Sequence, residues 1–141
     1  MANHYSCGIL IKQIHDIMEK NANNVLREEE LTISQFGVIV LLDEREGKTS
    51  TFKELEKEFG VSQPTMAGIL NRLEQKRLVE ILGDSEDKRI RRAHLTPKGE
   101  VKCKEGYKHM REAEEYLLQS LTKDEAAEFN KLLQKVRKSF E

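Results

Sequence analysis

Apolar residues recur at three- and four-residue steps along most of the chain, which is the spacing of one face of an α-helix. Between these stretches the pattern is polar, with glycine, serine or threonine at the joints. The spacing predicts six helices, at residues 5–28, 32–47, 51–60, 62–75, 96–121 and 122–140. The chain is therefore expected to be mainly α-helical.

Helix starts carry clear signals. Three of them have a threonine followed three residues later by Gln or Glu, a capping box in which each residue's side chain bonds the other's backbone N–H. These pairs are Thr32–Gln35, Thr51–Glu54 and Thr122–Glu125. Gly60 suits the left-handed conformation that ends a helix, and Pro64 falls in a first turn, where its missing N–H costs nothing.

The period changes to that of β-strands at residues 79–82 and 90–95, on either side of a charged turn that begins Gly83-Asp84-Ser85. A helix, a tight turn and a second helix precede this hairpin. The sequence therefore predicts a winged helix-turn-helix: mainly α, with a small β-hairpin wing.

In that fold the second helix presents its N-terminal turn to the major groove of DNA. Gln and Thr can bond base edges or phosphates, and a glycine lets the backbone approach closely. The predicted groove-facing residues are Ser62, Gln63, Pro64, Thr65, Gly68 and Arg72.

The overall charge of the chain does not favour binding to nucleic acid. The 24 basic and 25 acidic residues leave a net charge of -1 and a pI near 6.5. Such a balance excludes DNA binding by bulk charge. However, residues 62–99 hold 8 basic and 5 acidic residues, which is +3, and the remainder of the chain is -4. Arginine is attracted to narrow minor grooves, and a wing tip is small enough to enter one. Asp87 can orient Arg89 there, and Lys88 and Arg91 are expected to contact DNA beside it.

The motifs Ser62-Gln63-Pro64-Thr65, Leu70–Lys76, Asp87-Lys88-Arg89 and Leu95-Thr96-Pro97-Lys98-Gly99 resemble those of the multiple-antibiotic-resistance regulator (MarR) family. The resemblance implies a homodimeric winged-helix transcription regulator. Members usually repress, and many release DNA when a small ligand binds. The expected organisation is a dimerisation region (1–30 and 97–141) around a DNA-binding region (31–96).

Two residues depart from the family pattern. Arg77 stands where glycine is usual, so the helix end there must change its geometry or strain a non-glycine residue. Ile81 stands where a basic residue is common, which removes one expected phosphate contact.

Composition supports pairing of two chains. Only 38% of the residues are apolar and eight are aromatic, so one chain can bury only a thin core. The long terminal helices have narrow apolar stripes, which suit packing against a second copy. The alternative is that these helices cover one another within one subunit.

The resemblance implies an effector pocket, and His15, Met18 and Phe36 are candidates for its lining. Cys7 resembles a peroxide-sensing cysteine of one branch of the family, although a free cysteine is more often a small buried hydrophobe, as is expected of Cys103. The four histidines show no close ligand spacing, and no nucleotide or nucleophile motif is present. No metal, cofactor or enzymatic activity is predicted.

The expected function is sequence-specific binding of a pseudo-palindromic operator, with repression relieved by a small ligand or an oxidant. The alternative is a dimeric ligand- or protein-binding module whose winged helix is not used on DNA. The longest apolar run has seven residues and two cysteines make no disulfide framework, so a cytoplasmic protein with no membrane contact is expected.

Overall fold

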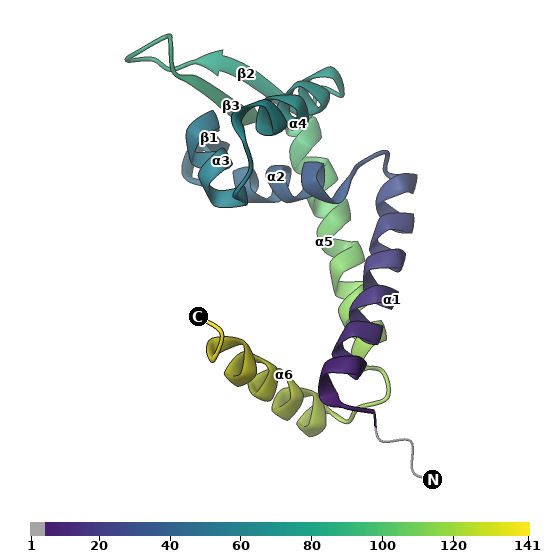
Figure 1. The fold of residues 1–141 in the computed structure, drawn as a ribbon. Helices are drawn as coiled ribbons and strands as arrows, with labels where there is room; N and C mark the ends of the chain where they lie inside the picture. Colours follow the sequence, from purple (N-terminus) through teal and green to yellow (C-terminus); the bar gives the residue numbers. More distant parts are fainter. Residues whose placement is uncertain (1–4) are drawn as a thin grey trace. The chain divides into compact units, whose positions relative to one another are not determined.

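The computed structural model describes residues 5–141, which form the predicted helices and wing (Figure 1). Residues up to Tyr107 make one compact unit and residues 108–141 a second. The elements, in chain order, are α1 (Cys7–Glu28), α2 (Ile33–Glu44), a 3-10 turn (Glu46–Lys48), β1 (Thr49–Thr51), α3 (Phe52–Phe59), α4 (Gln63–Gln75), β2 (Val79–Gly83), β3 (Arg91–Leu95), α5 (Pro97–Leu118) and α6 (Lys123–Lys138). The predicted fold class is confirmed. The helix predicted over 32–47 is shorter, because α2 ends at Glu44, where Arg45 takes an extended conformation before the 3-10 turn.

Helix starts follow the sequence signals. Thr32 and Thr122 form complete capping boxes with Gln35 and Glu125. Thr51 also caps α3, but the Glu54 carboxylate accepts a hydrogen bond from the Ser50 hydroxyl at 2.9 Å. Local signals therefore place these helix starts correctly, because a cap involves only neighbours in the chain.

The sheet has three strands, one more than the hairpin predicted from the sequence. Its order is β1-β3-β2 and both pairings are antiparallel. The segment Thr49–Thr51 is too short to show an alternating pattern, and its partners lie far away in the sequence, so no local signal marked it as a strand. In the first unit, β2 and β3 extend past α3 as the wing (Figure 1).

One core lies between the sheet and the helices of the first unit. It combines residues from α2, α3, α4, β2, β3 and α5. Its fully buried members include Ile39, Leu55, Leu70, Leu95 and Cys103. The apolar face of α4 is therefore directed inward, and the opposite, polar face is left on the surface.

Three helices end in the same backbone geometry. After α4, the N–H of Leu78 bonds the carbonyl of Leu73 and the N–H of Arg77 bonds that of Glu74, a Schellman motif. In this motif the residue just after the helix adopts the left-handed conformation, with positive φ. This residue is Glu30 after α1, Gly60 after α3 and Arg77 after α4. The departure noted at Arg77 is thus accommodated by strain, at φ 62°, and the helix-end geometry that glycine favours is retained.

The start of α5 is attached to this helix end. Thr96 donates its hydroxyl to the carbonyl of Arg77 at 2.7 Å and accepts the N–H of Gly99 at 3.0 Å. A Cβ on Gly99 would overlap the carbonyl oxygen of Leu78 and the side chain of Leu95. Only glycine allows this close approach, which gives the Leu-Thr-x-x-Gly motif a physical explanation.

Ile81 also has a structural role. In the sheet it pairs with Ala93, on the face that packs against the core, and its side chain is half-buried. Its N–H donates to the Glu74 carboxylate of α4 at 3.2 Å. An inward-facing position favours an apolar side chain, which accounts for isoleucine here.

We expect Arg77→Gly to stabilise the protein by about 1 kcal/mol, because a non-glycine residue in the left-handed region costs about 1–2 kcal/mol, partly offset by the greater freedom of glycine in the unfolded chain. Arg77→Ala keeps the Cβ and serves as the control, with no stabilisation expected. Urea unfolding measures both variants. Equal stability of the two variants would mean that the strain at this position is negligible.

Candidate nucleic-acid interface

The exposed face of α4 carries the residues predicted to meet a DNA groove. Gln63, Pro64, Thr65, Gly68 and Arg72 are all exposed, whereas the apolar face of the same helix is buried. This separation follows from the helical period, because the two sets occupy opposite sides.

Ser62 begins this helix and acts within the protein. Its hydroxyl accepts the N–H of Thr65 at 3.3 Å and donates to the Thr65 hydroxyl at 2.9 Å. Because a serine has one hydroxyl proton, this leaves the Thr65 hydroxyl as the donor that can face a ligand. Ser62 therefore shapes the first turn of α4, and Thr65 is the better candidate for direct contact.

The wing tip contains the predicted pair of Asp87 and Arg89. The Arg89 side chain donates from Nε to Asp87 Oδ1 at 3.1 Å and from Nη2 to Oδ2 at 3.0 Å. Its backbone N–H also donates to Oδ1, at 3.0 Å. The Arg89 side chain is 91% exposed although both bonds are made, and these bonds lower the pKa of Asp87. Arg89 is thus held at the tip with its remaining donors pointing to solvent.

The two arginines of β3, Arg91 and Arg92, are held differently from Arg89. Arg92 lies 3.4 Å from Asp84 and 3.4 Å from the Thr49 hydroxyl. Arg91 lies over the ring of Phe52, with Cζ 4.9 Å from the ring centroid. Lys88 is exposed beside Arg89. The sequence did not indicate these partners of Arg91 and Arg92, because strand pairing and packing bring them together.

The residues predicted to line an effector pocket occupy two elements. His15 and Met18 are exposed on α1, whereas the Phe36 side chain of α2 is half-buried and packs so closely on Gly106 that a Cβ there would overlap its ring. Two open depressions lie along α1 and its junction with α2, and none of these three residues lines them. The effector pocket stays a prediction.

His15 lies beside two acidic side chains of α1, which the search for closely spaced histidines in the sequence did not consider. Its Nδ1 lies 3.5 Å from Asp16 and 3.6 Å from Glu19. All three side chains are exposed, and Asp16 also accepts a hydrogen bond from Lys12 at 2.7 Å. His4, the histidine nearest Cys7, lies outside the described residues.

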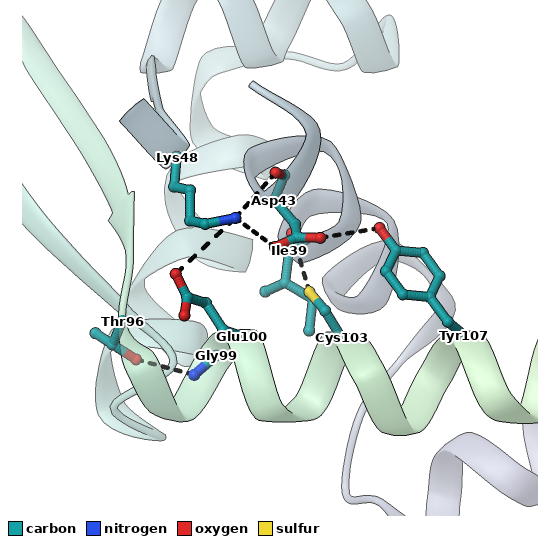
Figure 2. Close-up of polar contacts among 8 residues, drawn as sticks. All are labelled: Ile39, Asp43, Lys48, Thr96, Gly99, Glu100, Cys103 and Tyr107. Atoms are coloured by element: carbon teal, nitrogen blue, oxygen red, sulfur yellow. Dashed lines mark hydrogen bonds and ion pairs between the residues drawn. The ribbon is translucent and has the colours of Figure 1, made fainter. Parts of the chain in front are cut away.

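The two cysteines have opposite surroundings. Cys7 is exposed in the first turn of α1, and its redox role stays a prediction. Cys103 is buried, and its thiol donates to the carbonyl of Ile39 at 3.3 Å (Figure 2). Burial raises the pKa of the Cys103 thiol to about 12. The prediction that Cys103 is a core residue is confirmed.

A polar cluster lies beside this cysteine. Lys48 donates to the Asp43 carboxylate at 2.8 Å and lies 3.9 Å from Glu100, and Tyr107 donates to Asp43 at 3.2 Å (Figure 2). The cluster joins α2 and the 3-10 turn to the first part of α5. It therefore helps to fix α5 on the helix-turn-helix core.

No helix among residues 5–141 is both long and apolar enough to cross a membrane.

The folded elements define a winged helix-turn-helix protein with its polar helix face and an arginine-bearing wing exposed. A family model described as "MarR family" matches residues 30–90. The multiple antibiotic resistance protein MarR of Salmonella typhimurium is 30% identical over 130 residues, which cover 92% of this chain and 89% of the relative. This chain belongs to the MarR family of transcriptional regulators.

Solved structures agree with this assignment. Wild-type MarR from E. coli superposes with a TM-score of 0.80 at 28% identity, over 95% of this chain and 98% of the other. A mutant of that MarR, in complex with operator DNA, superposes with a TM-score of 0.73 at 29% identity, over 92% and 91% of the two chains.

We expect Asp87→Asn to weaken operator binding about 2- to 10-fold, although it removes a negative charge from the wing. The reason is that an amide cannot hold the guanidinium through two charged bonds. Glu86→Gln removes the same charge from the neighbouring exposed residue and is expected to strengthen binding slightly. Fluorescence anisotropy with labelled DNA measures both. A gain of affinity in Asp87→Asn equal to that of the control would contradict an orienting role.

We also expect Cys103 to resist alkylation in the folded protein, because burial shields the thiol and its raised pKa leaves it protonated at about pH 8. The variant Cys7→Ser has this thiol alone. Mass spectrometry after iodoacetamide treatment should show labelling in urea and almost none without it. Rapid labelling of the folded variant would contradict the buried position.

Proposed function

We propose that this transcriptional regulator binds a pseudo-palindromic operator as a homodimer, with α4 in the major groove and the wing in the minor groove. The bidentate pair of Asp87 and Arg89 carries the proposal. It holds an exposed guanidinium at the tip of a hairpin. A narrow minor groove of DNA concentrates negative potential and therefore attracts a guanidinium in this position. A held side chain loses less rotamer entropy on binding than a free one.

The terminal helices are proposed to form the dimer, with residues 1–30 and 97–141 as the dimerisation region and 31–96 as the DNA-binding region. In support, no described residue of α1 or α6 is buried, although both helices carry apolar stripes. Exposed members include Ile9, Ile17, Leu133 and Val136. Apolar stripes of this kind gain stability when a second chain covers them.

Repression relieved by a small effector is the proposed regulation, with the effector pocket near His15, Met18 and Phe36 and a cytoplasmic location. An enzymatic role is not proposed, since the family to which the chain belongs is one of transcriptional regulators. The alternative is a dimeric ligand- or protein-binding module, which the following experiment separates from a DNA-binding regulator.

DNA selected from a random pool should bind the wild-type protein specifically, with an affinity that falls steeply as salt rises. We expect Arg89→Ala to weaken this binding by more than about 1 kcal/mol while the dimer stays intact by light scattering. Lys104→Ala, which removes an exposed charge from α5, is the matched control. It lies in the proposed dimerisation region, so light scattering should show an intact dimer, and it should bind DNA normally. If no sequence is enriched and salt has no effect, the non-DNA alternative is favoured.

A further inference from the structure

The three arginines between the wing tip and β3 differ in how many donors their guanidinium groups have free. Arg89 uses Nε and Nη2 on Asp87. Arg92 directs Nη1 to Asp84 and Nε to the Thr49 hydroxyl. Arg91 makes no ion pair within residues 5–141 and instead lies over the Phe52 ring. Arg91 alone of the three combines a defined orientation with a complete set of donors.

Strand geometry explains why neighbouring arginines have such different surroundings. Successive side chains of a strand point to opposite faces. Arg92 pairs with Leu82 and Thr51 on the outer face, whereas Arg91 shares the inner face with buried Ala93. The residue opposite Arg91 is Gly83, which has no side chain to compete for the space. Arg91 is therefore directed toward the helices at the base of the wing.

Phe52 provides a fixed support at that place. It is the first residue of α3, directly after the cap Thr51, and its half-buried ring packs against the core. A ring that is held by the core and by a helix start has little freedom to move. Stacking on it restricts the plane of the Arg91 guanidinium.

The chemistry of stacking differs from that of an ion pair. A carboxylate uses two donors of a guanidinium and neutralises its charge, as Asp87 does for Arg89. An aromatic face attracts the cation through the ring quadrupole and leaves all five in-plane N–H donors available. The ligand that fits a charged fork of this kind is an anion with two acceptor oxygens, such as a phosphodiester.

We propose that Arg91 binds a phosphate of the DNA backbone and that Phe52 is the residue that positions it. The proposal rests on the proposed DNA-binding function and assigns different tasks to two wing arginines. Arg89, at the tip, enters the minor groove. Arg91, at the base of the wing and stacked beside the start of α3, contacts the backbone, where the positive end of the α3 dipole favours an anion as well.

A phosphate contact has a signature that a base contact lacks. We expect Arg91→Gln to weaken binding to the selected operator and to a scrambled duplex by the same factor. The slope of log K against log salt should become shallower by about 0.9 for each protomer, because one fewer counterion is released. Anisotropy titrations of both duplexes at several salt concentrations measure this. A loss confined to the selected operator would overturn the assignment to phosphate.

The positioning role is tested by changing the ring and keeping the charge. We expect Phe52→Leu to weaken operator binding about 2- to 5-fold, in line with the worth of an exposed cation–π contact. In the Arg91→Gln background the same change should have no effect on affinity. Phe59→Leu, at the other end of α3, is the matched control. Phe59 is also half-buried against the core, but Arg91 stacks on Phe52 and not on Phe59, so operator affinity should be unchanged.

Arg91→Lys provides a second approach that leaves the core untouched. Lysine keeps the charge but lacks the flat fork, so we expect weaker binding with an unchanged salt slope. Circular dichroism and urea unfolding establish that each variant is folded in the assay. If Phe52→Leu weakens binding equally in the wild type and in the Arg91→Gln background, Phe52 acts through packing and the positioning role is wrong. If the wild type binds no DNA specifically, the proposed function itself fails.

Discussion

The end of α4 depends on one close contact, the approach of Gly99 to the carbonyl of Leu78. No side chain fits between them, so the start of α5 lies directly against the end of the helix that carries the exposed polar face. Thr96 adds a hydrogen bond to the Arg77 carbonyl, and Lys98 donates to that of Lys76. A carbonyl at a helix end needs a partner from outside the helix, and here α5 provides it. The position of α4 is therefore coupled to that of α5.

The positive charges of the wing are held in place by specific neighbouring side chains. With a net charge of -1, the protein cannot attract DNA by bulk charge, so each useful cation has to be aimed. Asp87 holds one guanidinium and the Phe52 ring another, whereas Asp84 ties Arg92 into the outer face of the sheet. The acidic residues of the wing thus orient neighbouring arginines, at a small cost in positive charge.

The success of sequence-based prediction varied with the distance between the interacting residues. Capping boxes at Thr32 and Thr122 and the Asp87–Arg89 pair involve residues at most three apart, and all are present as predicted. β1 was missed because its three residues become a strand only by pairing with β3. The partners of Arg91 and Arg92 were missed for the same reason, since no local pattern encodes a contact between distant segments.

The sequence by itself determined where helices start, which helix faces are apolar, and which charged residues occupy the wing. These properties depend on residues within one or two turns of each other, where backbone geometry is nearly fixed. Only the tertiary structure decided that Ile81 packs inward and that Arg91 stacks on Phe52. Each of these contacts joins elements that are separate in the chain, and its formation depends on the packing of the whole core.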